Sequence, residues 1–167
     1  MTELLRIDAN NYTDDMTVFE KNAVRAIIIR HGKLAVQESN SGYYKILGGG
    51  VDEGETYEDA LAREVREESG LVIIPKSIKE IGSVTEIRQD LYDKTTKYIC
   101  HSFFYFCDAK EKLTKTCLTE SEIREGFSLS WVTYDEFIEK NQNIKDMPWV
   151  DRDTEFVKML RDGKLSK

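Results

Sequence analysis

A group of carboxylates with helical spacing is the part of this chain that could carry out chemistry. Eight acidic residues fall between Gly49 and Leu71 against only two basic ones, so this segment has a formal charge of −6 out of −7 for all 167 residues. The acids are Asp52, Glu53, Glu55, Glu58, Asp59, Glu64, Glu67 and Glu68, and the bases are Arg63 and Arg66. Negative charge this concentrated indicates a cation site and argues against nucleic acid as a partner.

Three of these acids share one face of an expected helix. The pattern predicts a helix over 56–69, with Gly70 directly after its end. At about 100° per residue, Glu64, Glu67 and Glu68 fall within the apolar stripe of that helix. An ordinary amphipathic helix has its charged residues on the opposite face. Carboxylates placed in this way repel one another and are costly to bury.

A cation among the three carboxylates would remove this cost. Arg63 points to one side of them, so we expect a divalent ion, and Mg²⁺ first, because it prefers oxygen ligands and often binds together with substrate phosphates. The alternative is an ordinary solvated helix in which Arg63 and Arg66 form pairs with acids one turn away.

A glycine-rich loop precedes this helix. Gly48, Gly49 and Gly50 are consecutive, and Gly54 follows shortly before the helix begins. Glycines let the backbone approach a ligand closely, and helix N-termini favour phosphate. The loop lacks the lysine pattern of a P-loop, so its meaning depends on the adjacent glutamates.

The remaining pattern predicts an α/β fold in which a mixed sheet lies between helices. Strands are expected over 23–30, 33–38, 43–47, 78–88, 96–108 and 128–132, with short edge strands over 4–8 and 17–20. Further helices are expected over 133–139 and 153–160. The length is typical of one domain.

The sequence from Gly49 to Leu71 resembles the Nudix box, G-x5-E-x7-R-E-U-x-E-E-x-G-U, where U is aliphatic, and all nine specified positions match. The matching residues are Gly49, Glu55, Arg63, Glu64, Val65, Glu67, Glu68, Gly70 and Leu71. The resemblance implies a Nudix-type (MutT-like) α/β/α sandwich over 1–167. Residues 1–20 would be an N-terminal extension and 49–71 the box.

Nudix enzymes hydrolyse a nucleoside diphosphate linked to another moiety, with Mg²⁺ or Mn²⁺ as cofactor. The resemblance therefore implies catalytic roles for Glu64, Glu67, Glu68 and Arg63. The implied metal ligands are Glu64, Glu67, Glu68 and the main-chain carbonyl of Gly49. Glu64 is alternatively the base that takes a proton from water. Arg63 and Glu55 resemble a structural pair, and Gly70 is structural in the box.

Residues outside the acidic side chains of the box are candidates for binding the nucleotide. Arg25, Lys45 and Gly50 are expected beside the phosphates, although surface salt bridges are an equal alternative for the two basic residues. A later glutamate often assists in this family, and Glu120, Glu122 and Glu125 remain open. Tyr43, Tyr44 and Tyr98 could stack on a base or belong to the core.

Composition limits the setting and the partners. No apolar run is long enough to cross a membrane, the first residues resemble no export signal, and three cysteines form no C-x-x-C pair. We expect a cytoplasmic protein that binds a small nucleotide derivative, with a homodimer through 4–20 because those strands have no evident partner. The alternative function is a catalytically inactive Nudix-fold sensor that binds nucleotides. Isomerisation of an isoprenoid diphosphate is disfavoured by the complete box.

Overall fold

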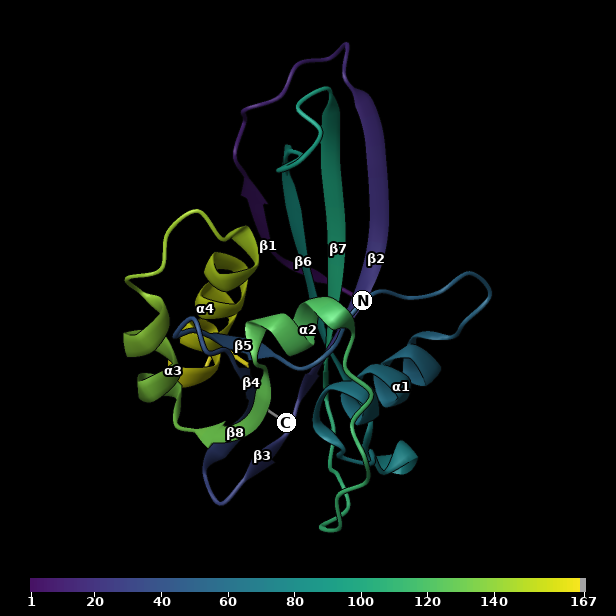
Figure 1. Cartoon of the computed structure of the whole chain (residues 1–167), viewed down its shortest axis with the longest axis vertical. Coiled ribbons are helices and arrows are strands. Elements are labelled where there is room, and N and C mark those ends of the chain that lie inside the picture. Colours follow the sequence, from purple (N-terminus) through teal and green to yellow (C-terminus); the bar gives the residue numbers. More distant parts are fainter. Residues whose placement is uncertain (166–167) are drawn as a thin grey trace.

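The structure is a computed structural model that describes residues 1–165, and its strands form two four-stranded sheets (Figure 1). The first sheet has the order β1-β6-β7-β2. Its strands are β1 (Glu3–Asp8), β2 (Thr17–Ile27), β6 (Lys79–Gln89) and β7 (Thr96–Phe106). The sheet is mixed, because β6 and β7 are antiparallel whereas β1 runs parallel to β6 and β2 parallel to β7.

The second sheet is antiparallel and centred on β4. It contains β3 (Ile29–Arg30), β4 (Lys33–Glu38), β5 (Tyr44–Ile46) and β8 (Ser128–Val132), and β4 pairs with each of the other three. The glycine-rich loop begins directly after β5, so this sheet places the loop beside the helix that follows it.

Helices pack on both sides of the strands (Figure 1). On one side, α1 (Tyr57–Ser69) buries Leu61 and Val65 in one apolar cluster. On the other, α3 (Tyr134–Asn141) and α4 (Pro148–Arg161) bury apolar side chains such as Phe137 and Phe156 in a second cluster. Because each cluster lies between strands and helices, the expected α/β/α fold class is confirmed.

Local sequence defines both ends of α1. The Thr56 hydroxyl accepts a hydrogen bond from the Asp59 N–H, which caps the N-terminus. At the other end Gly70 has a φ of 72°, and its N–H donates to the Arg66 carbonyl. The backbone needs glycine there, because φ is positive and a Cβ would lie 2.3 Å from the Thr114 carbonyl oxygen. The predicted extent of this helix is confirmed.

The two short edge strands expected at 4–8 and 17–20 both lie at edges of the first sheet, and only the second differs from the expectation, in its length. Residues 17–20 begin the long strand β2, which continues without a break to Ile27. Both β1 and β2 have partners in their own chain, β6 and β7. The reason for expecting a homodimer through 4–20 therefore no longer holds.

Two further differences concern helices. The last helix begins at Pro148, before the predicted residue 153, because proline is favoured in the first turn. A short helix that was not predicted, α2 (Glu120–Glu125), has a capping box made by Thr119 and Glu122. A short 3₁₀ helix spans Pro75–Ser77. Within residues 1–165, no helix has the length and apolar character needed to cross a membrane.

Candidate active site

Glu68 is the most deeply buried carboxylate of the glutamate group, with 2% of its surface exposed. Its Oε1 lies 2.7 Å from the Lys45 Nζ, and its Oε2 accepts a hydrogen bond of 2.6 Å from the Gly48 N–H. Burial raises the pKa of Glu68, and the nearby Lys45 ammonium and the two hydrogen bonds offset only part of this effect. The loop after β5 and the C-terminal half of α1 are thus joined through one carboxylate.

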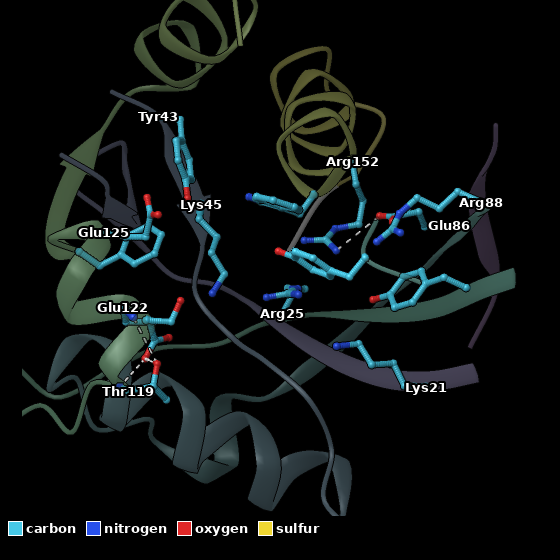
Figure 2. Close-up of a pocket in the computed structure, with 15 residues that line it drawn as sticks. Lys21, Arg25, Tyr43, Lys45, Glu86, Arg88, Thr119, Glu122, Glu125 and Arg152 are labelled. Atoms are coloured by element: carbon cyan, nitrogen blue, oxygen red, sulfur yellow. Dashed lines mark hydrogen bonds and ion pairs between the residues drawn. The ribbon is translucent and has the colours of Figure 1, made fainter. Parts of the chain in front are cut away.

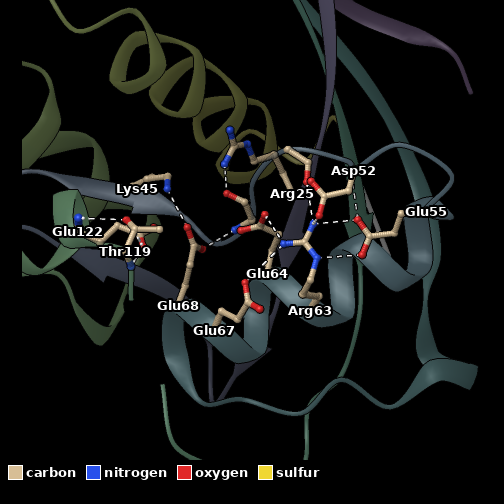
Figure 3. A network of polar contacts seen from close by, with 12 residues as sticks. Arg25, Lys45, Asp52, Glu55, Arg63, Glu64, Glu67, Glu68, Thr119 and Glu122 are labelled. Atoms are coloured by element: carbon tan, nitrogen blue, oxygen red, sulfur yellow. Dashed lines mark hydrogen bonds and ion pairs between the residues drawn. The ribbon is translucent and has the colours of Figure 1, made fainter. Parts of the chain in front are cut away.

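Arg63 organises the rest of the group (Figure 3). Its Nε and Nη2 donate to the two oxygens of Glu55 at 2.9 and 2.8 Å, and Nη2 also donates to the Gly50 carbonyl at 3.0 Å. Its Nη1 lies 2.8 Å from Glu64 Oε1 and 3.4 Å from Glu67 Oε2. The hydrogen bond with Glu55 raises the pKa of Arg63 and lowers that of Glu55. The implied contact between Arg63 and Glu55 is therefore present.

The expectation for the three glutamates needs a correction. Only Glu68 is buried, whereas the side chains of Glu64 and Glu67 are 17% and 33% exposed. Two of the protein's own basic residues also compensate the charge, since Arg63 contacts two of the carboxylates and Lys45 contacts the third. Helical periodicity could not show this, because Lys45 comes from a separate strand.

The glycine loop fits closely between β2 and α1. A Cβ on Gly49 would lie 2.4 Å from Glu64 Oε2, and one on Gly48, whose φ is 128°, would lie 2.1 Å from the Val24 carbonyl oxygen. The Val24 N–H donates to the Gly49 carbonyl at 2.9 Å, and the Arg25 guanidinium donates to the Gly48 carbonyl. Glycine is required here because the backbone itself touches a carboxylate and a neighbouring strand.

A cavity of about 400 Å³ opens beside this loop (Figure 2). Its lining residues are Lys21, Arg25, Tyr43, Lys45, Glu86, Arg88, Tyr92, Tyr98, Thr119, Ser121, Glu122, Glu125, Phe127, Trp149 and Arg152. Lys45 and Arg25 belong both to this lining and to the contacts with Glu68 and Gly48. The cavity and the glutamate group are therefore parts of one site.

The aromatic residues of the cavity differ in how free their rings are. Tyr98 is already covered, since the Arg88 guanidinium lies 4.0 Å from its ring centre and Phe19 stacks on it at 6.0 Å. Tyr43 and Phe127 meet edge to face at 5.8 Å at the other end of the cavity. Tyr43 is itself only 3% exposed, so the ring available to a base at that end of the cavity is Phe127, which is partly exposed.

The later glutamates are divided by their position. Glu122 and Glu125 line the cavity, and among its lining residues Glu120 does not appear. The Glu122 carboxylate accepts hydrogen bonds from the Thr119 N–H and hydroxyl, so it serves the cap of α2. Glu125 Oε2 accepts a single hydrogen bond, of 3.3 Å, from the Ser41 hydroxyl. Of the three candidates, Glu125 is the carboxylate most available to a ligand.

Comparison with known protein families identifies the family of this chain. The family model described as the NUDIX domain matches residues 20–153. The chain belongs to the Nudix family. It is a hydrolase that acts on phosphorus-containing anhydrides. A similar curated protein is the nucleoside triphosphatase NudI of Escherichia fergusonii, which is 31% identical over 107 residues, 62% of this chain and 70% of that protein. The nucleoside triphosphatase NudI of an Enterobacter species is 30% identical over 114 residues, 68% of this chain and 64% of that protein.

Solved structures support the same fold. A Nudix hydrolase from Nitrosomonas europaea has a TM-score of 0.57 at 21% identity and covers 80% of this chain and 85% of its own. The ORF135 protein of E. coli has a TM-score of 0.53 at 23% identity, with 83% and 90% covered. At these identities the likeness concerns the fold alone, and it agrees with the Nudix-type sandwich.

The donor set of this Nudix site suits a hard divalent cation. Glu64, Glu67, Glu68 and the Gly49 carbonyl offer only oxygen, which Mg²⁺ and Mn²⁺ prefer. The Gly49 carbonyl already accepts a hydrogen bond from the Val24 N–H at 2.9 Å. In residues 1–165, however, no three acidic, histidine or cysteine side chains are gathered into a ready-made metal cage. Each glutamate is turned toward Arg63 or Lys45, so binding a cation requires the carboxylates to rotate.

Several residues of the Nudix cavity were not predicted from the sequence. Glu86, Arg88, Trp149 and Arg152 line it, from β6 and from the first turn of α4. Two arginines and a carboxylate in apolar elements are unusual, and that alone could have marked them. Tyr44, by contrast, stacks on Phe137 at 5.9 Å and does not appear among the lining residues.

Proposed function

We propose that this Nudix hydrolase is a metal-dependent pyrophosphohydrolase. It cleaves the diphosphate bond of a nucleoside diphosphate linked to another moiety, such as a nucleoside triphosphate or a nucleotide sugar. The observation that carries the proposal is the set of contacts of Glu68, which joins the glycine loop to Lys45, a residue that lines the cavity. The nucleoside triphosphatases among the curated relatives support triphosphates as the first substrates to test.

In this proposal Glu64, Glu67, Glu68 and the Gly49 carbonyl hold Mg²⁺ or Mn²⁺. The ion, when bound, would neutralise phosphate charge and lower the pKa of a water molecule. Arg63 holds the loop against the helix through Glu55 and the Gly50 carbonyl, and so fixes the direction of the glutamates. No covalent enzyme intermediate is needed, because water attacks phosphorus directly.

The chain's basic residues would bind the phosphates. Lys45 and Arg25 border both the glutamates and the cavity, and the Gly50 backbone lies in the same loop. The base would lie toward Tyr43 and Phe127. We assign proton removal from water to Glu64, with Glu125 as the second candidate. The variants Glu64→Gln and Glu125→Gln distinguish them, because only loss of the base removes the acidic limb of the pH–rate profile, where activity rises as the base loses its proton.

A panel of nucleoside triphosphates and nucleotide sugars with Mg²⁺ or Mn²⁺ tests the proposal. The expected products are a nucleoside monophosphate together with pyrophosphate or a sugar phosphate, and no product in excess chelator. Release of inorganic phosphate alone, or full activity in chelator, would contradict it. Tight nucleotide binding without any product would favour the second function, an inactive sensor. The three intact glutamates disfavour a sensor, because binding alone does not need them.

We further propose that residues 1–167 form one Nudix domain. The partner is a small nucleotide, with neither nucleic acid nor membrane, and the setting is the cytoplasm. The first point is tested by a single cooperative unfolding transition in calorimetry, because independent domains would unfold separately.

A further inference from the structure

Three arginines from three distant parts of the chain lie in the cavity (Figure 2). Arg25 comes from β2, Arg88 from β6 and Arg152 from α4, and all three are at least nine-tenths buried. All three line the cavity. We call these residues the arginine cluster.

The carboxylates around the arginine cluster form ion pairs with Arg88 and Arg152 and not, within residues 1–165, with Arg25. Arg88 Nε donates to Glu86 Oε1 at 2.7 Å, and Arg152 Nε donates to Asp153 Oδ1 at 2.9 Å. Arg152 Nη1 reaches the same Glu86 only at 4.0 Å. Arg88 Nη1 also lies 4.0 Å from Asp90 Oδ2, so three carboxylates serve Arg88 and Arg152, whereas Lys21 adds a further positive charge to the lining.

Arg25 carries the uncompensated charge. It is 7% exposed, and within residues 1–165 no carboxylate oxygen lies within 4.0 Å of it. Its guanidinium donates to the neutral Gly48 carbonyl, and its buried Nε has no hydrogen-bond partner in that part of the chain. Burial and the neighbouring Arg152 both lower the pKa of Arg25. A buried guanidinium in this position calls for an anion.

The cluster is also next to the reaction site. Arg25 donates to the Gly48 carbonyl, and the N–H of the same Gly48 donates to Glu68. One glycine therefore separates the arginines from the glutamates. An anion at the cluster would therefore lie beside a diphosphate bound over the glycine loop.

We infer that Arg25, Arg88 and Arg152 form a subsite for the terminal phosphate of the substrate. A terminal phosphate group carries about two negative charges. Its oxygens match guanidinium groups, which bind phosphate through paired hydrogen bonds. The preferred substrates are therefore nucleotides with a free terminal phosphate, nucleoside triphosphates above nucleotide sugars. This step rests on the proposed function, since it concerns the same site.

Calorimetric titration with inorganic pyrophosphate in excess chelator tests the subsite without turnover. The wild-type protein is expected to bind, and Arg25→Lys to bind about tenfold more weakly, because lysine keeps the charge but loses the paired donors. Arg30→Lys is the matched control. Arg30 also donates to main-chain carbonyls, at 3.1 and 3.3 Å from Ala109 and Lys110, but it does not appear among the cavity residues. It should bind as the wild type does.

Equal binding by wild type and Arg25→Lys, or no binding by wild type, would overturn the subsite. Circular dichroism checks folding, and Arg88→Lys provides the same comparison where Arg25→Lys does not fold. In turnover, Arg25→Lys should lower kcat/KM for triphosphates about tenfold more than for nucleotide sugars. If no nucleotide is hydrolysed but pyrophosphate binding depends on Arg25, the proposed function fails and the subsite stands.

Discussion

Glu68 is a residue whose proposed role in the site comes at a cost in folding stability. Its carboxylate is buried, and burial keeps its pKa above the ordinary value of 4.5 in spite of Lys45 and the Gly48 N–H. The folded state therefore binds this proton more tightly than the unfolded state does. Its contribution to stability is complete below the unfolded pKa and is lost as pH rises through the folded pKa.

The variant Glu68→Gln tests both sides of this balance. Because glutamine cannot ionise, the variant should be more stable than the wild type at pH 8, and the difference should shrink as pH falls toward 5. Its turnover should fall by more than about 100-fold, the upper range for losing a residue that supports a metal site. Urea unfolding across this pH range and a product assay measure the two effects. Lower stability of the variant at pH 8 would contradict the burial argument.

Arg63 is the second residue whose role can be isolated. It joins the loop and the helix through a paired interaction with Glu55 and a hydrogen bond to the Gly50 carbonyl. Arg63→Lys keeps the charge but not this geometry, so we expect a loss of about 1–3 kcal/mol in the free energy of unfolding. We also expect a fall in kcat/KM of about 10- to 100-fold.

The control for this change lies on the same helix. Arg66 is exposed, and Arg66→Lys should alter stability by no more than about 0.5 kcal/mol. Urea unfolding and steady-state kinetics on both variants give the comparison. Similar effects of the two substitutions would mean that Arg63 acts only through its charge.

At the scale of elements, the site depends on how the loop at 48–50 packs between β2 and α1. The backbone of Gly49 touches the Glu64 carboxylate, whereas a Cβ on Gly50 would meet nothing within 4 Å. The two adjacent glycines therefore have different reasons to be present.

This difference gives a paired test. Gly49→Ala should push Glu64 aside, lowering the free energy of unfolding by about 1–3 kcal/mol and weakening Mn²⁺ binding. Gly50→Ala should change stability by no more than about 0.5 kcal/mol, because its side chain has room. Thermal unfolding and titration with Mn²⁺ measure both. Equal losses in the two variants would show that the close packing at Gly49 has no special effect.

Another element connects the cavity with the fold as a whole. Asp153, on α4, accepts hydrogen bonds from the Ile46 N–H and from Arg152, so it ties the last helix to β5 and positions one arginine of the cluster.

The N-terminal strand β1 also has a structural role. Leu4, Leu5 and Ile7 of β1 pack against the core cluster that α3 and α4 cover. Strand β1, within the N-terminal extension, thus packs on the sandwich.

At the scale of the whole molecule, charge is distributed unevenly. The chain has a formal charge of −7, yet five basic residues line the cavity against three carboxylates, those of Glu86, Glu122 and Glu125. The basic residues are Lys21, Arg25, Lys45, Arg88 and Arg152. A focused positive field of this kind draws in anionic substrates even when the protein as a whole is negative.

Salt should therefore affect substrate capture more than the chemical step. Raising NaCl from about 0.05 M to about 0.5 M shortens the screening length about threefold. With metal kept saturating, we expect KM for a nucleoside triphosphate to rise about tenfold, the low end of the gain from focused charge, with little change in kcat. Initial-rate kinetics at several salt concentrations check this, and a KM independent of salt would contradict it.

The sequence by itself determined the chemistry and most of the elements. The spacing of Arg63, Glu64, Glu67 and Glu68 identified the box, and capping and glycine signals placed α1 correctly. Most strands were also predicted, because alternation and β-branched residues act over a few positions. The same local view divided β2 and missed α2, whose capping residues Thr119 and Glu122 were the available signal.

Only the tertiary structure decided what surrounds the glutamates. Lys45 meets Glu68 across 23 positions, and the Ile46 N–H meets Asp153 across 107. The meeting of Arg25 with Arg152 likewise depends on how β2 and α4 pack. Periodicity fixes the faces of one helix or strand, but contacts between elements follow from packing over long separations. For that reason the sequence predicted a site for a cation, and the fold revealed the basic cavity beside it.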